Sequence, residues 1–248
     1  MTTFGVIGGS GLDDPQFLEN PSDVEIQTPF GRLVSPIKTG TIAGKDVAIL
    51  SRHGREHTVP PTQVNFRAHV HALKELGCEA ILATTAVGSL REEIDRGCLV
   101  VLDQFIDFTR HRPVSFYECF EPHCPKHTPM ADPFDERLRG LLVTACRNVG
   151  VEFHDRGTVV TIEGPRFSTR AESRMFRAWG ADVINMSTAP ECILANEAGI
   201  PYAAVAMSTD YDCWKTDEAP VTWDDILRIF KQNAEKVTSV LVAAIAAG

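Results

Sequence analysis

The 248-residue sequence predicts a single domain, residues 1–248, folded as a three-layer α/β/α sandwich with a mixed central sheet. Two observations lead to this fold class. Short apolar runs alternate with helical stretches along the chain, as in sheets that helices cover on both faces. Hydrophobic residues make up 44% of the chain, enough to bury a sizeable core, and single α/β domains often reach about 200–250 residues.

Seven short apolar runs are expected to be buried strands, because their lengths and flanking glycines are typical of strands inside a covered sheet. In chain order they cover residues 4–8, 46–51, 80–85, 98–102, 158–162, 182–186 and 202–208. Helical stretches separate many of these runs, so we expect a largely parallel or mixed sheet.

Three segments repeat apolar residues at the spacing of one helical face. The first, residues 61–76, stops before Gly77, and the second, residues 138–149, stops before Gly150. Glycine often follows a helix because it readily adopts the left-handed backbone conformation. The third segment begins at residue 222 and continues towards the C-terminus. By contrast, residues 110–133 are rich in Pro, His and aromatic residues without a steady period, and we expect a long ordered loop with a functional or interfacial role.

Charge and hydropathy exclude several classes of partner. The net charge of -9 argues against nonspecific binding to nucleic acid or to an anionic membrane. No apolar run approaches the roughly 20 residues that span a bilayer, and the N-terminal residues enter a strand without a basic region or cleavage site. We expect a soluble cytoplasmic protein. Its seven cysteines are dispersed and odd in number, without zinc-ligand spacing, so we expect reduced thiols and no metal site.

Three predicted strand ends carry groups that can bind an anion. Residues 8–11 offer glycine amides and a serine hydroxyl, residues 52–57 offer Arg and His, and residues 84–89 offer two threonines in a turn. Strand ends are where open α/β sheets bind ligands. Each segment alone also fits a structural turn or a solvated loop, but together they predict a phosphate site. The glycine pattern fits neither the dinucleotide fingerprint nor the P-loop.

The segment 185–191 joins a strand to a helix. Thr188 and Glu191 have the spacing of a capping box, with Pro190 in the first turn, which is a sufficient structural explanation for all three. Met186 fits either an ordinary core position or an apolar floor under a sugar ring.

Asp210 and Asp212 follow an apolar strand, where residues two apart point to the same side. Two carboxylates held close together cannot both ionise cheaply, so one is expected to be protonated near neutral pH. A metal site and a solvated turn are the alternatives. No third carboxylate or histidine stands at a suggestive spacing for a metal.

The combined motifs resemble those of the 5'-methylthioadenosine phosphorylases, within the trimeric branch of the purine nucleoside phosphorylases. They run in order from about residue 4 to residue 240 and read GVIGGSGLDD, LSRHGREHTVPPTQVNFRAHVHALKELGC, ATTAVGSLREEI, TIEGPRFSTRAES, ADVINMSTAPE and AMSTDYDCW. The resemblance implies a nucleoside phosphorylase-like fold and a pentosyltransferase of purine and methionine salvage. Its reaction would be phosphorolysis of S-methyl-5'-thioadenosine to adenine and 5-methylthioribose 1-phosphate, with adenosine and 5'-deoxyadenosine as further candidate substrates.

The resemblance also implies a role for individual residues. Phosphate would contact Ser10, Arg52, His53, Thr85, Ala86 and Ser187. The nucleoside would contact Phe167, Ser168, Ile184, Asn185, Met186, Thr209, His57, His127, Val221, Trp223 and Ile226. Asp210 and Asp212 would be catalytic and face the purine edge, with a protonated Asp210 donating to N7. Phosphate would be a co-substrate, and no cofactor or metal is implied.

The family would assemble as a homotrimer or a dimer of trimers, with His127 entering the neighbouring subunit's site. Ser10 and Ser187 stand where relatives often have threonine, which keeps the hydroxyl. The sequence ends at Gly248, whereas longer relatives extend further and help close the pocket around the 5' substituent, so the preference for methylthio over hydroxyl is left open. Two alternatives remain at this point: a nucleosidase that uses water, and a purine-binding protein without activity.

Overall fold

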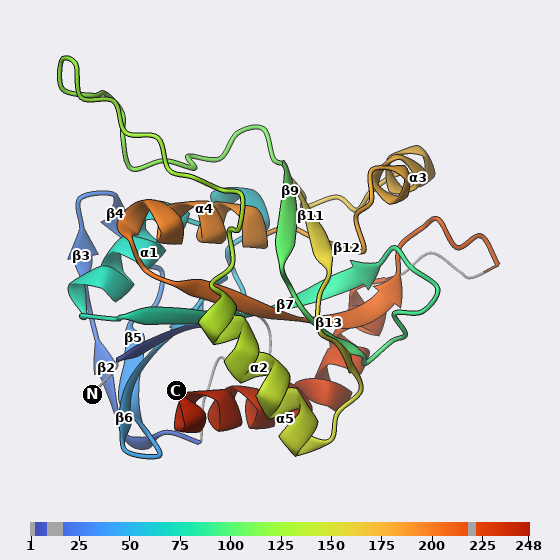
Figure 1. Cartoon of the computed structure of the whole chain (residues 1–248), viewed down its shortest axis with the longest axis horizontal. Coiled ribbons are helices and arrows are strands. Elements are labelled where there is room, and N and C mark those ends of the chain that lie inside the picture. Colours follow the sequence, from blue (N-terminus) through green and yellow to red (C-terminus); the bar gives the residue numbers. More distant parts are fainter. Residues whose placement is uncertain (1–2, 9–16, 218–221) are drawn as a thin grey trace.

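The structure, a computed structural model, describes residues 3–8, 17–217 and 222–248 and contains a large mixed sheet between helices (Figure 1). Within the described residues the sheet has 11 strands, of which eight follow the order β10-β8-β13-β7-β1-β6-β5-β2. These strands are β1 (Phe4–Gly8), β2 (Glu19–Val24), β5 (Ile37–Ile42), β6 (Lys45–Ser51), β7 (Ala80–Ser89), β8 (Leu99–Val101), β10 (Phe153–His154) and β13 (Tyr202–Tyr211).

The centre of the sheet is parallel and its margins are mixed. β6, β1, β7 and β13 are parallel neighbours, whereas β5 and β2 on one side and β8 on the other pair antiparallel. A branch leaves β7 through β12 (Val183–Asn185), which pairs antiparallel with it, and continues to β11 (Thr158–Ile162) and β9 (Gln104–Phe108). A separate small sheet joins β3 (Gln27–Thr28) and β4 (Gly31–Arg32).

Helices cover both faces of the central sheet, as predicted. α1 (Phe66–Glu75) and α4 (Thr188–Ala198) lie on one face, and α2 (Glu136–Val149) and α5 (Trp223–Ala247) lie on the other (Figure 1). β1 contributes side chains to the core on both faces of the sheet, because successive residues of a strand point to opposite faces. Ile7 packs in the same hydrophobic cluster as Leu73 of α1, and Phe4 packs in the same cluster as Leu142 of α2. α3 (Arg170–Ala178) packs beside the β9-β11-β12 branch.

Several predicted boundaries need correction. The helix expected over 61–76 is a short 3-10 turn, Pro61–Gln63, followed by α1, because Asn65 interrupts it and caps α1 by accepting a hydrogen bond from the Ala68 amide at 3.1 Å. The strand expected to end at residue 85 continues to Ser89, and that expected to end at 208 continues to Tyr211, because β7 and β13 pair along their whole length. β2, β5, β9 and α3 were not predicted, since their sequences lack a long apolar run.

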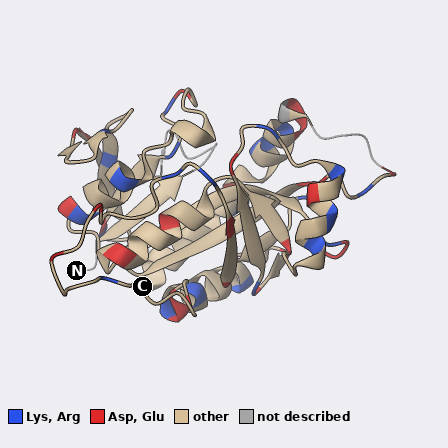
Figure 2. Ribbon diagram, turned by 90° about the horizontal axis from the view of Figure 1, so that it is seen from above, with Lys and Arg blue, Asp and Glu red and all other residues tan. Residues whose placement is uncertain are grey.

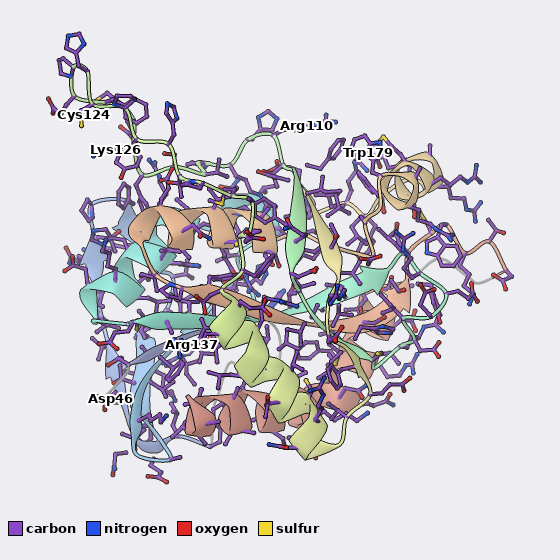
Figure 3. All side chains as sticks on the ribbon, viewed as in Figure 1. Asp46, Arg110, Cys124, Lys126, Arg137 and Trp179 are labelled. Carbon is purple, nitrogen blue, oxygen red and sulfur yellow. The ribbon has the colours of Figure 1, made fainter. Side chains whose placement is uncertain are left out.

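Residues 110–133 form an extended loop that projects away from the sheet, as the sequence predicts (Figure 1). Figure 3 shows Arg110 where the loop leaves β9, with Cys124 and Lys126 far out along it. Charged residues gather on the outer helices, turns and loops, whereas most of the central sheet carries none (Figure 2). All seven cysteines are in the described part of the chain and are free thiols. Among the described helices, none combines the length and apolar character that crossing a bilayer demands.

Candidate functional site

A cavity of about 590 Å³ opens where β6, β7, β12 and β13 direct polar side chains away from the core. Most residues assigned from the sequence line it. They are Arg52, His53, His57, Thr85, Ala86, Phe167, Ser168, Ile184, Asn185, Met186, Ser187, Thr209, Asp210, Asp212 and Ile226. The parallel pairing of β6, β1, β7 and β13 brings these sequence-distant segments to one side of the sheet.

Four assigned residues are not placed in the cavity. His127 lies on the projecting loop, where it is exposed and packs its ring against Phe120 at a centroid distance of 5.9 Å. Ser10 and Val221 are outside the described residues. Trp223 begins α5, and its side chain is likewise outside the description.

Arg52 is a buried cation held from one side by Glu191. Its side chain donates through Nε and Nη2 to the two carboxylate oxygens of Glu191, the second contact at 3.0 Å, and through Nη1 to the Thr84 carbonyl at 3.0 Å. Burial opposes the charge of Arg52, but the attraction and hydrogen bonds of Glu191 outweigh it, and the pKa of the guanidinium is raised. Three of its five N–H groups are used in these contacts, so two can serve a ligand in the cavity.

The Arg52–Glu191 pair corrects the interpretation of Glu191 as part of a capping box. α4 has Ser187 at its N-cap, and no side-chain hydrogen bond caps the helix there. Glu191 is completely buried and also accepts a hydrogen bond from the Tyr202 hydroxyl at 2.9 Å. A buried carboxylate needs such partners, and they outcompete a local cap. Residues 84–89 need a second correction: they are strand, not a turn, because β13 pairs with them along the whole segment and β12 pairs with Gly88 and Ser89.

Asn185 forms the centre of a buried hydrogen-bond network beside Arg52. Its amide nitrogen donates to the hydroxyls of Thr85 at 3.1 Å and Thr188 at 2.5 Å, and its oxygen accepts from Thr161 at 2.9 Å. The amide of Ser187 lies 3.4 Å from the same oxygen. These contacts occupy the donors of Asn185, so its side chain can fix the Thr85 hydroxyl and the start of α4. The sequence does not reveal this role.

His53 and His57 form a second wall of the cavity. Their rings are tilted towards each other with centroids 4.6 Å apart. His53 Nδ1 is 2.8 Å from the Val59 carbonyl, which can only accept, so Nδ1 carries the proton and Nε2 of the neutral ring is an acceptor. Burial and the neighbouring Arg52 lower the pKa of His53 to about 4. The ring is therefore neutral at physiological pH.

Asp210 and Asp212 converge over Gly88, four residues further along β7 than Thr84, whose carbonyl contacts Arg52. A methyl group on Gly88 would lie 3.2 Å from Asp210 Oδ2 and 3.5 Å from Asp212 Cβ, which confirms the predicted convergence. A β-bulge at Thr209 redirects the strand just before this pair. Burial raises the pKa of Asp212, and its hydrogen bond from Ser168, 2.8 Å from either carboxylate oxygen, acts in the opposite direction.

The wall between the two polar ends is mostly apolar. Ile184 and Met186 lie next to each other at the end of β12, and Phe167 is 45% exposed at the rim. Met186 packs so tightly on Gly164 that a Cβ there would lie 2.4 Å from its sulfur. The segment 58–61, Ile162 and Pro165 also line the cavity and have no role assigned from the sequence, whereas Gly88 belongs to the predicted segment 84–89. Among the described residues, no group of three or more His, Cys, Asp or Glu side chains is arranged to hold a metal.

Comparison with known proteins gives consistent matches over nearly the whole chain. Residues 3–246 match the phosphorylase superfamily. S-methyl-5'-thioadenosine phosphorylase from Xenopus tropicalis is 53% identical over 246 residues, and the protein of that name from Danio rerio is 52% identical over 244 residues; each match covers 97% of this chain and 87% of the relative.

Solved structures agree with the sequence matches. Methylthioadenosine phosphorylase from Schistosoma mansoni, in complex with adenine, superposes with a TM-score of 0.94 at 42% identity, covering 100% of this chain and 91% of that one. A mutant adenosine/methylthioadenosine phosphorylase from the same organism, in complex with methylthioadenosine, gives 0.93 at 41% identity, with 100% and 91% covered.

Proposed function

Because the chain belongs to the S-methyl-5'-thioadenosine phosphorylases of the phosphorylase superfamily, we propose that its cavity holds an adenine nucleoside next to inorganic phosphate. The enzyme splits the N-glycosidic bond of S-methyl-5'-thioadenosine and releases adenine and 5-methylthioribose 1-phosphate. One observation carries the proposal: a single cavity has a buried cation at one end and a buried pair of carboxyl groups at the other.

The cationic end supports binding of the nucleophile. The free N–H groups of Arg52 and the hydroxyls of Thr85 and Ser187 donate to phosphate oxygens, while His53 Nε2 accepts a hydrogen bond from the P–OH group of phosphate. A phosphate oxygen attacks the anomeric carbon as the bond to the purine nitrogen breaks. No covalent enzyme intermediate forms, so catalysis rests on positioning and on stabilising charge.

The carboxyl end supports recognition of adenine. The bond electrons leave with the base, and a protonated Asp210 donates its proton to N7 and so neutralises the departing adenine. Thr209 has one hydroxyl proton, and its oxygen lies 3.2 Å from the Val87 carbonyl and 2.8 Å from Asp210 Oδ1. The hydroxyl donates to Asp210 Oδ1, the shorter of the two contacts, and so holds this carboxyl group in place while Oδ2 carries the proton. Asp212 accepts from the exocyclic amine.

Assembly and location complete the proposal. The exposed position of His127 on the projecting loop supports a homotrimer in which His127 approaches the neighbouring subunit's 5' pocket. The sugar lies over Met186, and the 5' substituent faces His57 and Ile226. Phosphate is the only co-substrate, no cofactor takes part, and the enzyme works in the cytoplasm.

Product analysis tests the function and sets the substrate range. Purified protein is given methylthioadenosine, 5'-deoxyadenosine or adenosine, each with phosphate, and the corresponding inosine compounds serve as controls. We expect release of adenine from the adenine series and much slower turnover of the inosine series. Saturable binding of adenine without product from any nucleoside would make the protein a binding protein and contradict the proposal.

A further inference from the structure

Two residues that do not line the cavity, Glu191 and Tyr202, form a hydrogen-bonded chain that ends at Arg52, the cation proposed to bind phosphate. Both side chains are buried, with exposed fractions of 0% and 1%. Glu191 Oε2 accepts from Arg52 Nη2 at 3.0 Å and from the Tyr202 hydroxyl at 2.9 Å. A chain of hydrogen bonds therefore runs from β13 through α4 to the guanidinium after β6.

Tyr202 has the protonation state that a donor in this chain requires. Burial, followed by the charge of Glu191, raises the pKa of Tyr202 well above its ordinary value. The phenol therefore keeps its proton and can donate a hydrogen bond to Glu191. Glu191 contacts Arg52 with both oxygens, which fixes the plane of the guanidinium as well as its position. The Thr84 carbonyl adds a third contact at 3.0 Å.

This geometry leaves the guanidinium little freedom. Three of its N–H groups are committed to Glu191 and Thr84, so the remaining two point in a direction set by the plane of the Glu191 carboxylate. The Tyr202 hydroxyl in turn holds Glu191 Oε2 in that plane and draws part of its negative charge away from Arg52. Both effects increase the attraction of Arg52 for an anion in the cavity.

We propose that Glu191 and Tyr202 are positioning residues for phosphate: they hold Arg52 in the orientation that binds it, and the Tyr202 hydroxyl tunes phosphate affinity without touching the ligand. The inference rests on the proposed function, in which Arg52 binds phosphate. It predicts that loss of one hydroxyl outside the cavity wall changes the KM for phosphate selectively.

The test is Tyr202→Phe, which removes the hydroxyl and retains the ring that packs against Phe134 at a centroid distance of 5.9 Å. We expect the KM for phosphate to rise about three- to tenfold, as for loss of a single hydrogen bond, with the KM for methylthioadenosine changed less than twofold. Adenine affinity, measured by calorimetry without phosphate, should be unchanged, which verifies that the site is folded.

Tyr211→Phe is the matched control. Tyr211 lies on the same strand, and its hydroxyl also donates to a carboxylate, that of Asp95. Unlike Glu191, Asp95 is not the carboxylate that binds Arg52. The KM for phosphate should stay within twofold of that of the wild type. An equal rise in Tyr202→Phe and Tyr211→Phe, or a parallel rise in both KM values of Tyr202→Phe, would indicate a general structural effect and overturn the inference.

A double-mutant cycle with Arg52→Lys separates this inference from the proposed function. Lysine cannot form the two-point contact with Glu191, so Tyr202→Phe should add less than twofold to the phosphate KM in that background. If Arg52→Lys raises the phosphate KM and Tyr202→Phe does not, only the positioning role is wrong. If Arg52→Lys itself leaves the phosphate KM unchanged, the assignment of Arg52 to phosphate fails, and the positioning role fails with it.

Discussion

His53, half-buried, and His69, buried, lie near the charged guanidinium of Arg52, and their surroundings favour the neutral imidazole. Burial, followed by the charge of Arg52, lowers the pKa of His53 to about 4 and that of His69 to about 3. In the unfolded chain both would titrate near about 6.5. Below that pH the unfolded state binds protons that the folded state does not, so stability falls as pH decreases.

Replacing His69 with glutamine removes one of these titrations. His69 is 4% exposed, and its pKa shift should cost the wild type about 1.4 kcal/mol per pH unit between about pH 6.5 and 3. From pH 6.5 to pH 5, the free energy of unfolding should therefore drop by about 2 kcal/mol less in His69→Gln than in the wild type. Urea unfolding at both pH values measures this difference. His123→Asn, on the exposed loop, should retain the wild-type slope.

Asp210 should decide which base the enzyme accepts. Adenine presents an amine at position 6 and an acceptor at N7, which suit one ionised and one protonated carboxyl. A 6-oxo purine places a carbonyl opposite an ionised carboxylate, and an unmatched buried pair costs about 1–3 kcal/mol, or roughly tenfold to several-hundredfold in specificity. Asp210→Asn should lower turnover of methylthioadenosine, because asparagine has no acidic proton for N7. N7 and the 6-substituent are neighbours on one edge of the purine, so the new amide can also donate to a 6-carbonyl and should improve relative use of methylthioinosine.

The measurement is kcat/KM for methylthioadenosine and methylthioinosine in the wild type and Asp210→Asn. Asp46→Asn, at the exposed start of β6, is the matched control and should keep the wild-type ratio. Because Asp and Asn have nearly the same shape, stability should change little. If the ratio is the same in all three proteins, Asp210 does not read the base.

Among individual residues, the sequence identifies the side chains that line the cavity better than the buried side chains that orient them. Arg52, His53, Asp210 and Asp212 each follow or end an apolar run, so local patterns point to them. Glu191 is 139 positions from Arg52, and its spacing from Thr188 imitates a capping box. Only the fold brings Glu191 and Arg52 together, and burial then makes the ion pair prevail.

At the scale of elements, strand pairing determines the shape of the cavity. The sequence predicts the central strands because their apolar runs are short and continuous, but not their full lengths. β7 and β13 extend past their apolar parts to Ser89 and Tyr211, since polar residues there still find backbone partners in the neighbouring strand. The bulge at Thr209 carries no local signal, because it depends on the register between two strands far apart in the sequence.

Gly164, just after β11, packs against Met186, just after β12, and this contact leaves no room for an added atom. Gly164 has a φ of 65°, and a Cβ there would lie 2.4 Å from the Met186 sulfur. Gly164→Ala should therefore destabilise the protein by at least about 1 kcal/mol and raise the KM for the nucleoside, since Met186 must move. Thermal unfolding and steady-state kinetics measure the two effects.

Gly140→Ala is the matched control for Gly164→Ala. Gly140 lies inside α2, and no atom outside that helix's own backbone is within 4 Å of its Cβ position. Alanine should stabilise the helix by roughly 0.5–1 kcal/mol without affecting kinetics. A Gly164→Ala variant that matches Gly140→Ala in stability and nucleoside KM would show that the tight contact with Met186 is unimportant.

In the molecule as a whole, the projecting loop is the segment that extends furthest from the central sheet (Figure 1). Within residues 110–133, Arg112 is buried against the body of the protein, whereas Tyr117 and Phe120 further along the loop are 41% and 45% exposed. The sequence predicts the loop from its composition and its missing periodicity. It does not predict the direction of the loop, because that depends on contacts between residues far apart in the sequence, such as the hydrogen bond from the Ser115 hydroxyl to Glu197 at 2.9 Å.

Subunit mixing tests whether His127 serves a neighbouring site. Arg52→Ala and His127→Ala subunits, each nearly inactive alone, are unfolded together and refolded in equal amounts. In a mixed trimer, about a quarter of the sites combine an intact Arg52 with an intact His127 from the neighbour, so about a quarter of wild-type activity should return. If His127 acts within its own chain, no site is complete, and mixing should restore nothing.

Phosphorolysis and hydrolysis differ in the nucleophile, and isotope labelling distinguishes the two reactions. Methylthioadenosine is incubated with the enzyme in ¹⁸O-labelled water, with and without phosphate, and the sugar product is analysed by mass spectrometry. We predict turnover only with phosphate, giving unlabelled 5-methylthioribose 1-phosphate. Undiminished release of adenine without phosphate, with ¹⁸O in free methylthioribose, would show that water is the nucleophile and contradict the account.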